Sequence, residues 1–207
     1  MSAAPFVFAH PAMWPFTGQK QVKDWQQNYR STGSQPWHLD AGQTALSFSN
    51  GYLGYTEITH MTSNTTDASG AHIGVGYLTN GSKTATAAVI HLVRFGPDTD
   101  SPWEVIGTDD TTFTLTTPGY GAAVRTPMNV GGRINGVDES IRVQVRQPSA
   151  SRPIGTACCV AAGGSNAPWS TSVPYSGAID AVLTVAASTG GHIKDVERFT
   201  ITAVRPR

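Results

Sequence analysis

The sequence contains few charged residues. They make up 14% of the chain, against ~25% in typical soluble domains, so Thr, Ser, Gly, Asn and Gln must cover much of the surface. Lys plus Arg and Asp plus Glu number 14 each, which gives a formal net charge of zero, and the basic residues are scattered. A nucleic-acid partner requires clustered cations that displace condensed counterions, so we expect none.

Long apolar runs are also missing. No segment approaches the ~18–20 apolar residues that span a membrane. The first sixteen residues, MSAAPFVFAHPAMWPF, lack the basic region and the long apolar region of a signal peptide. Either the protein is cytoplasmic or this sequence begins after a removed leader or anchor. The family resemblance described below favours the second alternative.

Cysteine occurs only at two adjacent positions, Cys158 and Cys159. This excludes a Cys-x-x-Cys redox motif and a four-cysteine zinc site. The pair can close a vicinal disulfide in an oxidising compartment. It can equally be two small apolar residues on opposite faces of a strand, because successive side chains of a regular strand alternate. Both alternatives remain open at this point.

Motifs for catalysis are absent as well. The Gly-x-Ser-x-Gly elbow of hydrolases does not occur, and no two histidines have the His-x-His or His-x-x-x-His spacing of a local metal motif. We therefore expect no catalytic residue, no metal and no cofactor. His72 and His91 can still meet across a hairpin and form a metal or acid–base site with Asp109 or Asp110. We interpret them instead as histidines that face solvent or lie at the edge of the core.

Two helices are predicted near the N-terminus. Gln19–Thr32 places apolar residues at i, i+3 and i+7, along one helical face, and Gly33 stands where a C-terminal glycine belongs. Asp40 has the position of an N-cap with Gln43 three residues further on. The helix that it begins is predicted to continue to Gly54.

Alternating apolar residues then predict an antiparallel sheet. Asn80-Gly81 is the strongest hairpin signal. The expected strands are His72–Thr79, Ala85–Phe95, Trp103–Thr108 and Phe113–Thr116. Two helices packed on the inner face of one curved sheet would bury both apolar surfaces. Residues 14–116 therefore form a predicted α+β domain, whose outline resembles the cone-shaped domains of the nuclear-transport-factor-2 (NTF2) type.

The second half, residues 117–207, is predicted to be all β. Short strands recur at the spacing of a β-sandwich. They are Ala123–Val124, Met128–Ile134, Ser140–Gln147, Thr156–Ala161, Trp169–Tyr175, Ala181–Ser188 and Arg198–Arg205. Glycine-containing turns such as Asn135-Gly136 separate them.

A family resemblance covers this second half. The string TPGYGAAVRTPMNVGGRINGVDESIRVQVRQ (Thr117–Gln147), followed by PWSTSVPYS and RFTITAV, resembles the immunoglobulin-like domain of bacterial spore-germination and sporulation-associated surface proteins. The resemblance implies an extracytoplasmic protein, often a lipoprotein or membrane-anchored, with no catalytic residues. It also places a large aromatic core residue at Trp169.

Aromatic residues are dense in the first half. Cone-shaped folds have a mouth between helix and sheet, and concave aromatic-lined mouths bind small ligands. The candidate ligand-binding residues are Trp25, Trp37, Tyr52, Tyr77, His91 and Trp103. The alternative is that these side chains form an aromatic core and a domain interface.

The sequence thus predicts a non-catalytic bacterial cell-envelope or secreted protein that serves as an interaction or ligand-binding module. The expected partner is an envelope protein, a glycan or a small apolar ligand. The alternative is an isomerase- or dehydratase-like enzyme with a pocket in the N-terminal cone domain. Such an enzyme needs a general base, and the candidates for it are His72, His91 and Asp109.

Overall fold

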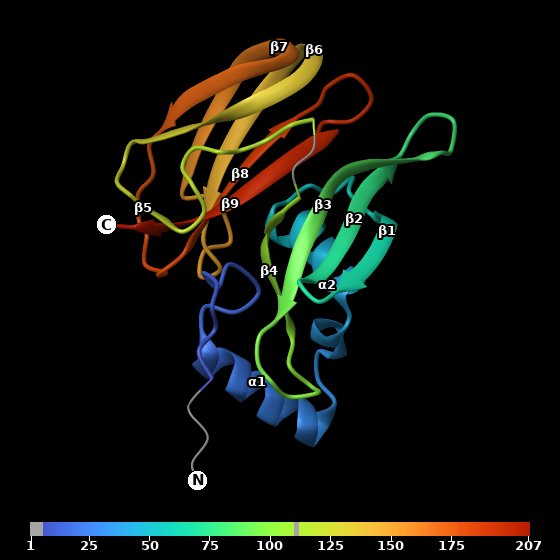
Figure 1. Cartoon of the computed structure of the whole chain (residues 1–207), viewed down its shortest axis with the longest axis vertical. Helices are drawn as coiled ribbons and strands as arrows, with labels where there is room; N and C mark the ends of the chain where they lie inside the picture. The colour runs from blue at the N-terminus through green and yellow to red at the C-terminus, as the bar shows by residue number, and fades with distance from the viewer. Residues whose placement is uncertain (1–5, 110–111) are drawn as a thin grey trace.

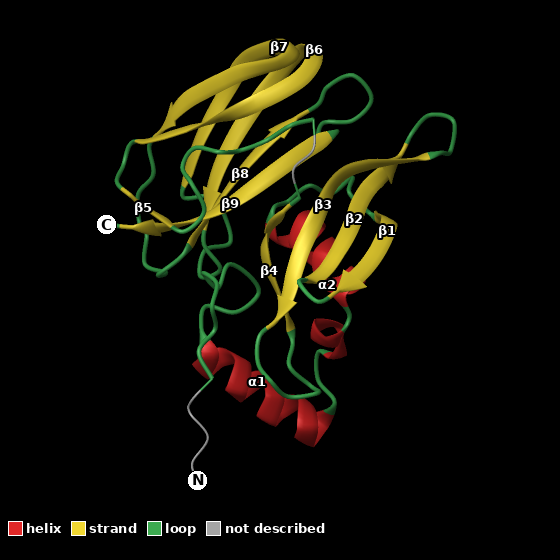
Figure 2. Cartoon of the chain, viewed as in Figure 1, coloured by secondary structure: helices red, strands yellow, loops and turns green. Residues whose placement is uncertain are grey.

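The structure is a computed structural model that describes residues 6–109 and 112–207. The chain is mostly β, with two sheets and a small helical part near the N-terminus (Figure 2). Of the helices in these two ranges, none has the length and apolar character needed to cross a membrane.

The first N-terminal helix has the predicted bounds, and the second begins where predicted but ends before the expected Gly54. Helix α1 (Gln19–Thr32) ends at Gly33, whose φ of 71° is left-handed and suits glycine. Helix α2 (Ala41–Leu46) begins after Asp40, whose Oδ1 accepts a hydrogen bond from the Gln43 backbone N–H at 2.9 Å. A 3-10 turn, η1 (Pro36–Leu39), precedes α2, and a π-helical turn, η2 (Ser47–Tyr52), continues it.

The first sheet is antiparallel, with strand order β1-β2-β3-β4. Its strands are β1 (His60–Asp67), β2 (Gly70–Leu78), β3 (Thr84–Arg94) and β4 (Trp103–Thr108). The predicted hairpin between β2 and β3 and the strand β4 are confirmed. Strand β1 is not predicted from the sequence, because most of its side chains are polar and exposed and leave no apolar alternation.

The prediction of a strand at Phe113–Thr116 in the first sheet is wrong, because this segment is no regular strand and forms isolated bridges to β6 of the other sheet instead. The Thr114 and Thr116 backbone N–H groups donate to Arg133 O and Gly131 O, both at 2.9 Å. Phe113 is buried in the second core. The chain therefore leaves the first sheet after Thr108, at the end of β4, and already lies against the second sheet at Phe113.

The second sheet has the order β5-β9-β8-β6-β7. Its strands are β5 (Ala122–Val124), β6 (Met128–Arg146), β7 (Gly155–Val173), β8 (Leu183–Thr189) and β9 (Arg198–Pro206). The β5–β9 pair is parallel and the other pairs are antiparallel. Strands β6 and β7 form a long ribbon that runs away from the first sheet (Figure 1).

Four of the expected short strands are joined in pairs into two long strands, β6 and β7. Each long strand thus has a first and a second arm, which correspond to the two short strands expected there. The predicted turn at Asn135-Gly136 is wrong, because β6 runs through it. The pairing register shifts on both sides of Gly136, so these residues form an irregularity inside a strand, where glycine typically marks a bulge or a bend.

The second core lies between the arms of this ribbon. Met128, Val130 and Ile134 from the first arm of β6 join Ile141 and Val143 from its second arm in one buried cluster. This cluster also contains side chains of β7, β8 and β9.

The two sheets share a buried apolar contact. Strand β8 is buried along its whole length: Leu183, Val185 and Ala187 face the second core, whereas Ala186 joins the first. Phe199 and Ile201 of β9 also join the first core. Because β8 and β9 contribute to both cores, the two halves of the chain are packed against each other.

Candidate functional sites

The six predicted ligand-binding residues do not gather around one cavity. Trp25 is buried in a small cluster beneath α1 with Phe16 and Phe95. Tyr52, Tyr77 and Trp103 are buried in the first core, where the Tyr52 hydroxyl donates to Thr184 Oγ1 at 3.3 Å and burial raises the pKa of that hydroxyl.

The remaining two of the six lie elsewhere. Trp37 is half-buried and stacks on Trp14, with 5.6 Å between ring centroids. His91 lies on the outer face of the first sheet. None of the cavities described below is lined by any of the six residues.

His72 and His91 meet across the β2–β3 hairpin. They are directly paired in the strand register, and their rings stack with centroids 4.3 Å apart. Their neighbours Ala71, Ile73 and Ile90 point into the first core, where α2 packs. Since side chains alternate along a strand, the two histidines lie on the opposite, outer face of the sheet.

Asp109 completes this cluster from the end of β4. Its Oδ2 lies 2.8 Å from His72 Nδ1. On the other side, His72 Nε2 lies 3.1 Å from Ser69 Oγ and 3.8 Å from Asp67 Oδ2. Asp110, which the sequence offers as an alternative, lies outside the described residues.

Cys158 and Cys159 form a vicinal disulfide. The register of β7 explains how adjacent sulfurs meet: Val160 pairs with Ile141 and Cys158 pairs with Arg142, so Cys159 is an extra residue at a β-bulge. A regular strand would direct the two side chains to opposite faces, whereas a bulge re-aims them. The first of the two sequence alternatives therefore applies, and both cysteines are exposed.

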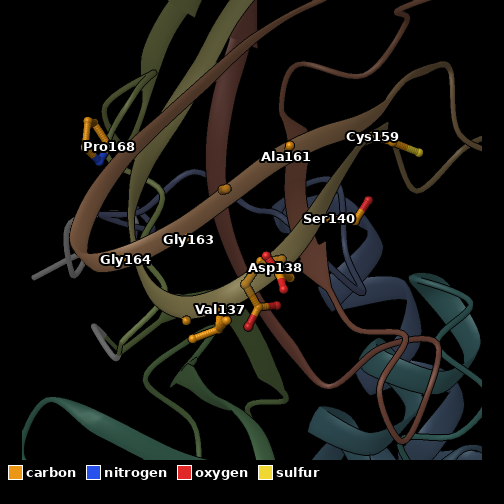
Figure 3. Close-up of a pocket in the computed structure, with 11 residues that line it drawn as sticks. Val137, Asp138, Ser140, Cys159, Ala161, Gly163, Gly164 and Pro168 are labelled. Carbon is orange, nitrogen blue, oxygen red and sulfur yellow. The ribbon is translucent and has the colours of Figure 1, made fainter.

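The larger of two hollows beside this disulfide has a volume of about 920 Å³ and lies along the ribbon. Figure 3 shows Val137, Asp138 and Ser140 of β6 and Cys159 and Ala161 of β7 around it. Its other lining residues are Gly136, Glu139, Ala162, Gly163, Gly164 and Pro168. Glu139 is already paired with Arg198 at 2.7 Å, so Asp138 is the carboxylate available to a ligand there.

The second hollow, which we call the junction cavity, has a volume of about 280 Å³. It lies where the two halves of the chain meet. Leu53, Gly54 and Tyr55 line it from the segment after η2. The rest of its lining comes from the second half of the chain: Arg142, Val143, Gln144, Thr156, Ala157, Cys158, Ser188 and Val196.

Two polar groups of the junction cavity lack strong partners within the chain. The Tyr55 hydroxyl is buried, and the nearby Ser188 and Gln144 side chains do not complete a hydrogen bond with it. Burial raises the pKa of this hydroxyl, so it stays a neutral donor. Arg142 donates only a long bond of 3.5 Å to Asp195 O, and among the described residues no carboxylate forms an ion pair with it.

Sequence reasoning missed this cavity. Arg142 alternates with Ile141 and Val143 and therefore looks like an ordinary solvent-facing residue of a half-buried strand. Only the packing of residues 53–55 against the second sheet converts it into a cavity residue. The adjacent cysteines were the one signal in the sequence that pointed to this region.

Comparison with known proteins adds no further assignment: no protein family, no curated protein and no solved structure matches this chain.

Proposed function

We propose that this chain is a non-catalytic binding module of an extracytoplasmic protein, and that its ligand occupies the junction cavity. The ligand class that fits is a small, mainly apolar molecule with one anionic or hydroxyl head group. The observation that carries the proposal is that Arg142, which forms no ion pair with a carboxylate of the described residues, lines a cavity together with Tyr55 where the two halves of the chain meet.

The lining supports this ligand class. Small-molecule sites are mostly apolar, contain a few convergent polar groups, and occur preferentially where domains meet. Leu53 and Val196 supply apolar wall. The guanidinium presents a forked set of donors that matches a carboxylate.

The vicinal disulfide supports the proposed compartment. Disulfides persist in secreted and cell-surface proteins and are rare in the reducing cytosol. A bacterial cell-envelope or secreted protein, lipoprotein-anchored or otherwise, therefore remains our proposal for its localisation.

We propose finer fold assignments on the same basis. The two arms of the β6–β7 ribbon enclosing one core support an immunoglobulin-like sandwich, as in the sporulation-associated surface domains. The helices α1 and α2 beside a four-stranded antiparallel sheet support the NTF2-like outline of the first half.

The other candidate ligands and the enzyme alternative have weaker support. A glycan or an envelope protein would have to use the open hollow at Asp138, which offers mostly small side chains. An isomerase- or dehydratase-like pocket in the cone needs a base inside it, and His72, His91 and Asp109 lie on the outer face of the sheet instead.

Ligand-observed NMR on the full chain tests the proposal. The probes are phenylacetate and octanoate, with benzyl alcohol as the neutral analogue and a glycan microarray as the competing arm. We expect both carboxylates to bind. We expect Thr156→Phe, which fills the cavity from β7, to abolish binding. Its matched control is Ala123→Phe, at an exposed position of β5 outside the cavity.

The head-group contacts are tested separately. Arg142→Gln should weaken carboxylate binding by about twofold to fivefold, because a partly solvated ion pair contributes modestly, and should leave benzyl alcohol unaffected. Arg125→Gln, at an exposed site, is the control. Equal binding by Thr156→Phe and the wild type, or binding of glycans alone, would refute the junction cavity as the ligand site.

A further inference from the structure

We propose that His72, His91 and Asp109 form a binding site for a divalent transition-metal ion, with Zn²⁺ as the ion that fits best. This site lies on the outer face of the first sheet and is independent of the proposed ligand cavity. Two imidazoles and one carboxylate are ligands that Zn²⁺ takes in proteins.

The donor atoms are already close together. One ligand atom from each of the three residues lies within 4.8 Å of the other two. In a tetrahedral zinc site, bonds of about 2.0–2.2 Å place the ligand atoms roughly 3.3 Å apart. A bound ion would therefore draw the ligand atoms up to about 1.5 Å closer together.

The hydrogen bond of His91 selects its ligand atom. His91 Nε2 lies 3.2 Å from Ser69 O, and a carbonyl oxygen only accepts, so Nε2 carries the hydrogen. In the neutral imidazole the lone pair is then on Nδ1, which can bind the ion. A metal-bound histidine typically donates its other ring N–H to a backbone carbonyl or a carboxylate in this way.

The charges around His72 favour a bound cation. Asp109 and Asp67 flank its ring on two sides. Among the described residues, no Lys or Arg forms an ion pair with either carboxylate. A divalent ion at this position would balance both charges, with Asp109 as a ligand and Asp67 as an outer partner through Ser69, whose hydroxyl and backbone N–H both contact Asp67.

The framework leaves room for the ion. Gly107 is the β4 residue that pairs with His91, and a side-chain carbon built there would meet nothing within 4 Å. Three protein ligands leave a fourth tetrahedral position for water or an incoming donor. The ligands come from β2, β3 and the end of β4, so the ion would link three strands at the end of the sheet nearest the passage to the second half.

Calorimetric titration of the chelator-treated full chain with ZnCl₂ tests this site, and the ligand-field spectrum of the Co²⁺ form reports its geometry. We expect one ion per chain and a tetrahedral Co²⁺ spectrum. His72→Ala, His91→Ala and Asp109→Asn should each weaken Zn²⁺ binding by at least about tenfold, and Ser69→Ala should do so by roughly tenfold as an outer-shell change.

The matched control is His192→Ala, a histidine in the loop before β9 outside this cluster, which should bind as the wild type does. Circular dichroism confirms that each variant is folded before titration. If the wild type binds no stoichiometric ion, or if His91→Ala and His192→Ala bind Zn²⁺ equally, the site does not exist. Weak binding of several ions, reduced by any histidine change, would also overturn the proposal.

Discussion

Replacement of Trp169 by Ala tests the packing of the second half. Trp169 begins the second arm of β7. Its side chain lies in the second core and is only 5% exposed. Its ring lies 5.6 Å from that of Phe113. Its indole Nε1 donates to Thr114 O at 3.2 Å. The side chain therefore links the segment around Thr114, which leads into the second half of the chain, to β7.

The expected loss follows from these contacts. Truncation of a buried Trp removes a large apolar area and leaves a cavity, which costs about 3–5 kcal/mol. The lost Nε1 hydrogen bond contributes about 1 kcal/mol of this. The free energy of unfolding of a domain is only ~5–15 kcal/mol, so Trp169→Ala should leave the protein marginally stable. Trp169→Phe keeps most of the ring and should cost only about 1–2 kcal/mol.

Equilibrium unfolding in urea, followed by far-ultraviolet circular dichroism, measures both variants against the wild type. This readout avoids tryptophan fluorescence, which the substitutions themselves change. A loss below about 1 kcal/mol for Trp169→Ala would mean that the side chain is not part of a packed core. It would refute the arrangement of the ribbon arms around the second core.

Three further predictions concern the body of the molecule. Burial raises the pKa of Glu104 well above its usual 4.5, so the folded state holds this proton more tightly than the unfolded state. The free energy of unfolding should therefore fall as the pH rises above 4.5 toward the folded pKa. Glu104→Gln should be more stable than the wild type near neutral pH. Urea unfolding measured from pH 4 to 8 should show a smaller decline of stability with pH for this variant than for the wild type. Limited proteolysis should cut exposed loops before the connection at Thr112–Thr117, because that segment is hydrogen-bonded to β6; rapid release of two intact halves would contradict the shared core. Intact mass spectrometry of protein denatured without reductant should find Cys158 and Cys159 closed to alkylation and the mass lower by two hydrogen atoms, whereas two alkylated thiols would rule out the vicinal disulfide.

The elements that the sequence predicted correctly are those with local signals. Helix α1 follows from one apolar face and Gly33, α2 from the Asp40 cap, and the β2–β3 hairpin from Asn80-Gly81. Each signal depends on residues a few positions apart, so no tertiary contact is needed to interpret it. Strand β1 lacked such a signal because it is a polar edge strand.

The errors arose where distant contacts decide the structure. Phe113–Thr116 has the alternation of a strand, but alternation does not say which sheet a strand joins. Asn135-Gly136 is a common turn dipeptide, and only its pairing with β7 keeps β6 continuous through it. The junction cavity depends on Tyr55 and Arg142, which are 87 positions apart in the sequence, and no pattern in the sequence relates them.

We propose that a small ligand binds between the two halves of the chain, beside the disulfide. The most direct test is a titration of ¹⁵N-labelled protein with phenylacetate, followed by two-dimensional amide NMR. We expect saturable shifts confined to amides around Tyr55, Arg142 and Cys158, and no such shifts in the Thr156→Phe variant. Shifts clustered at Asp138 or among the helices instead, or no saturable shift at all, would contradict it.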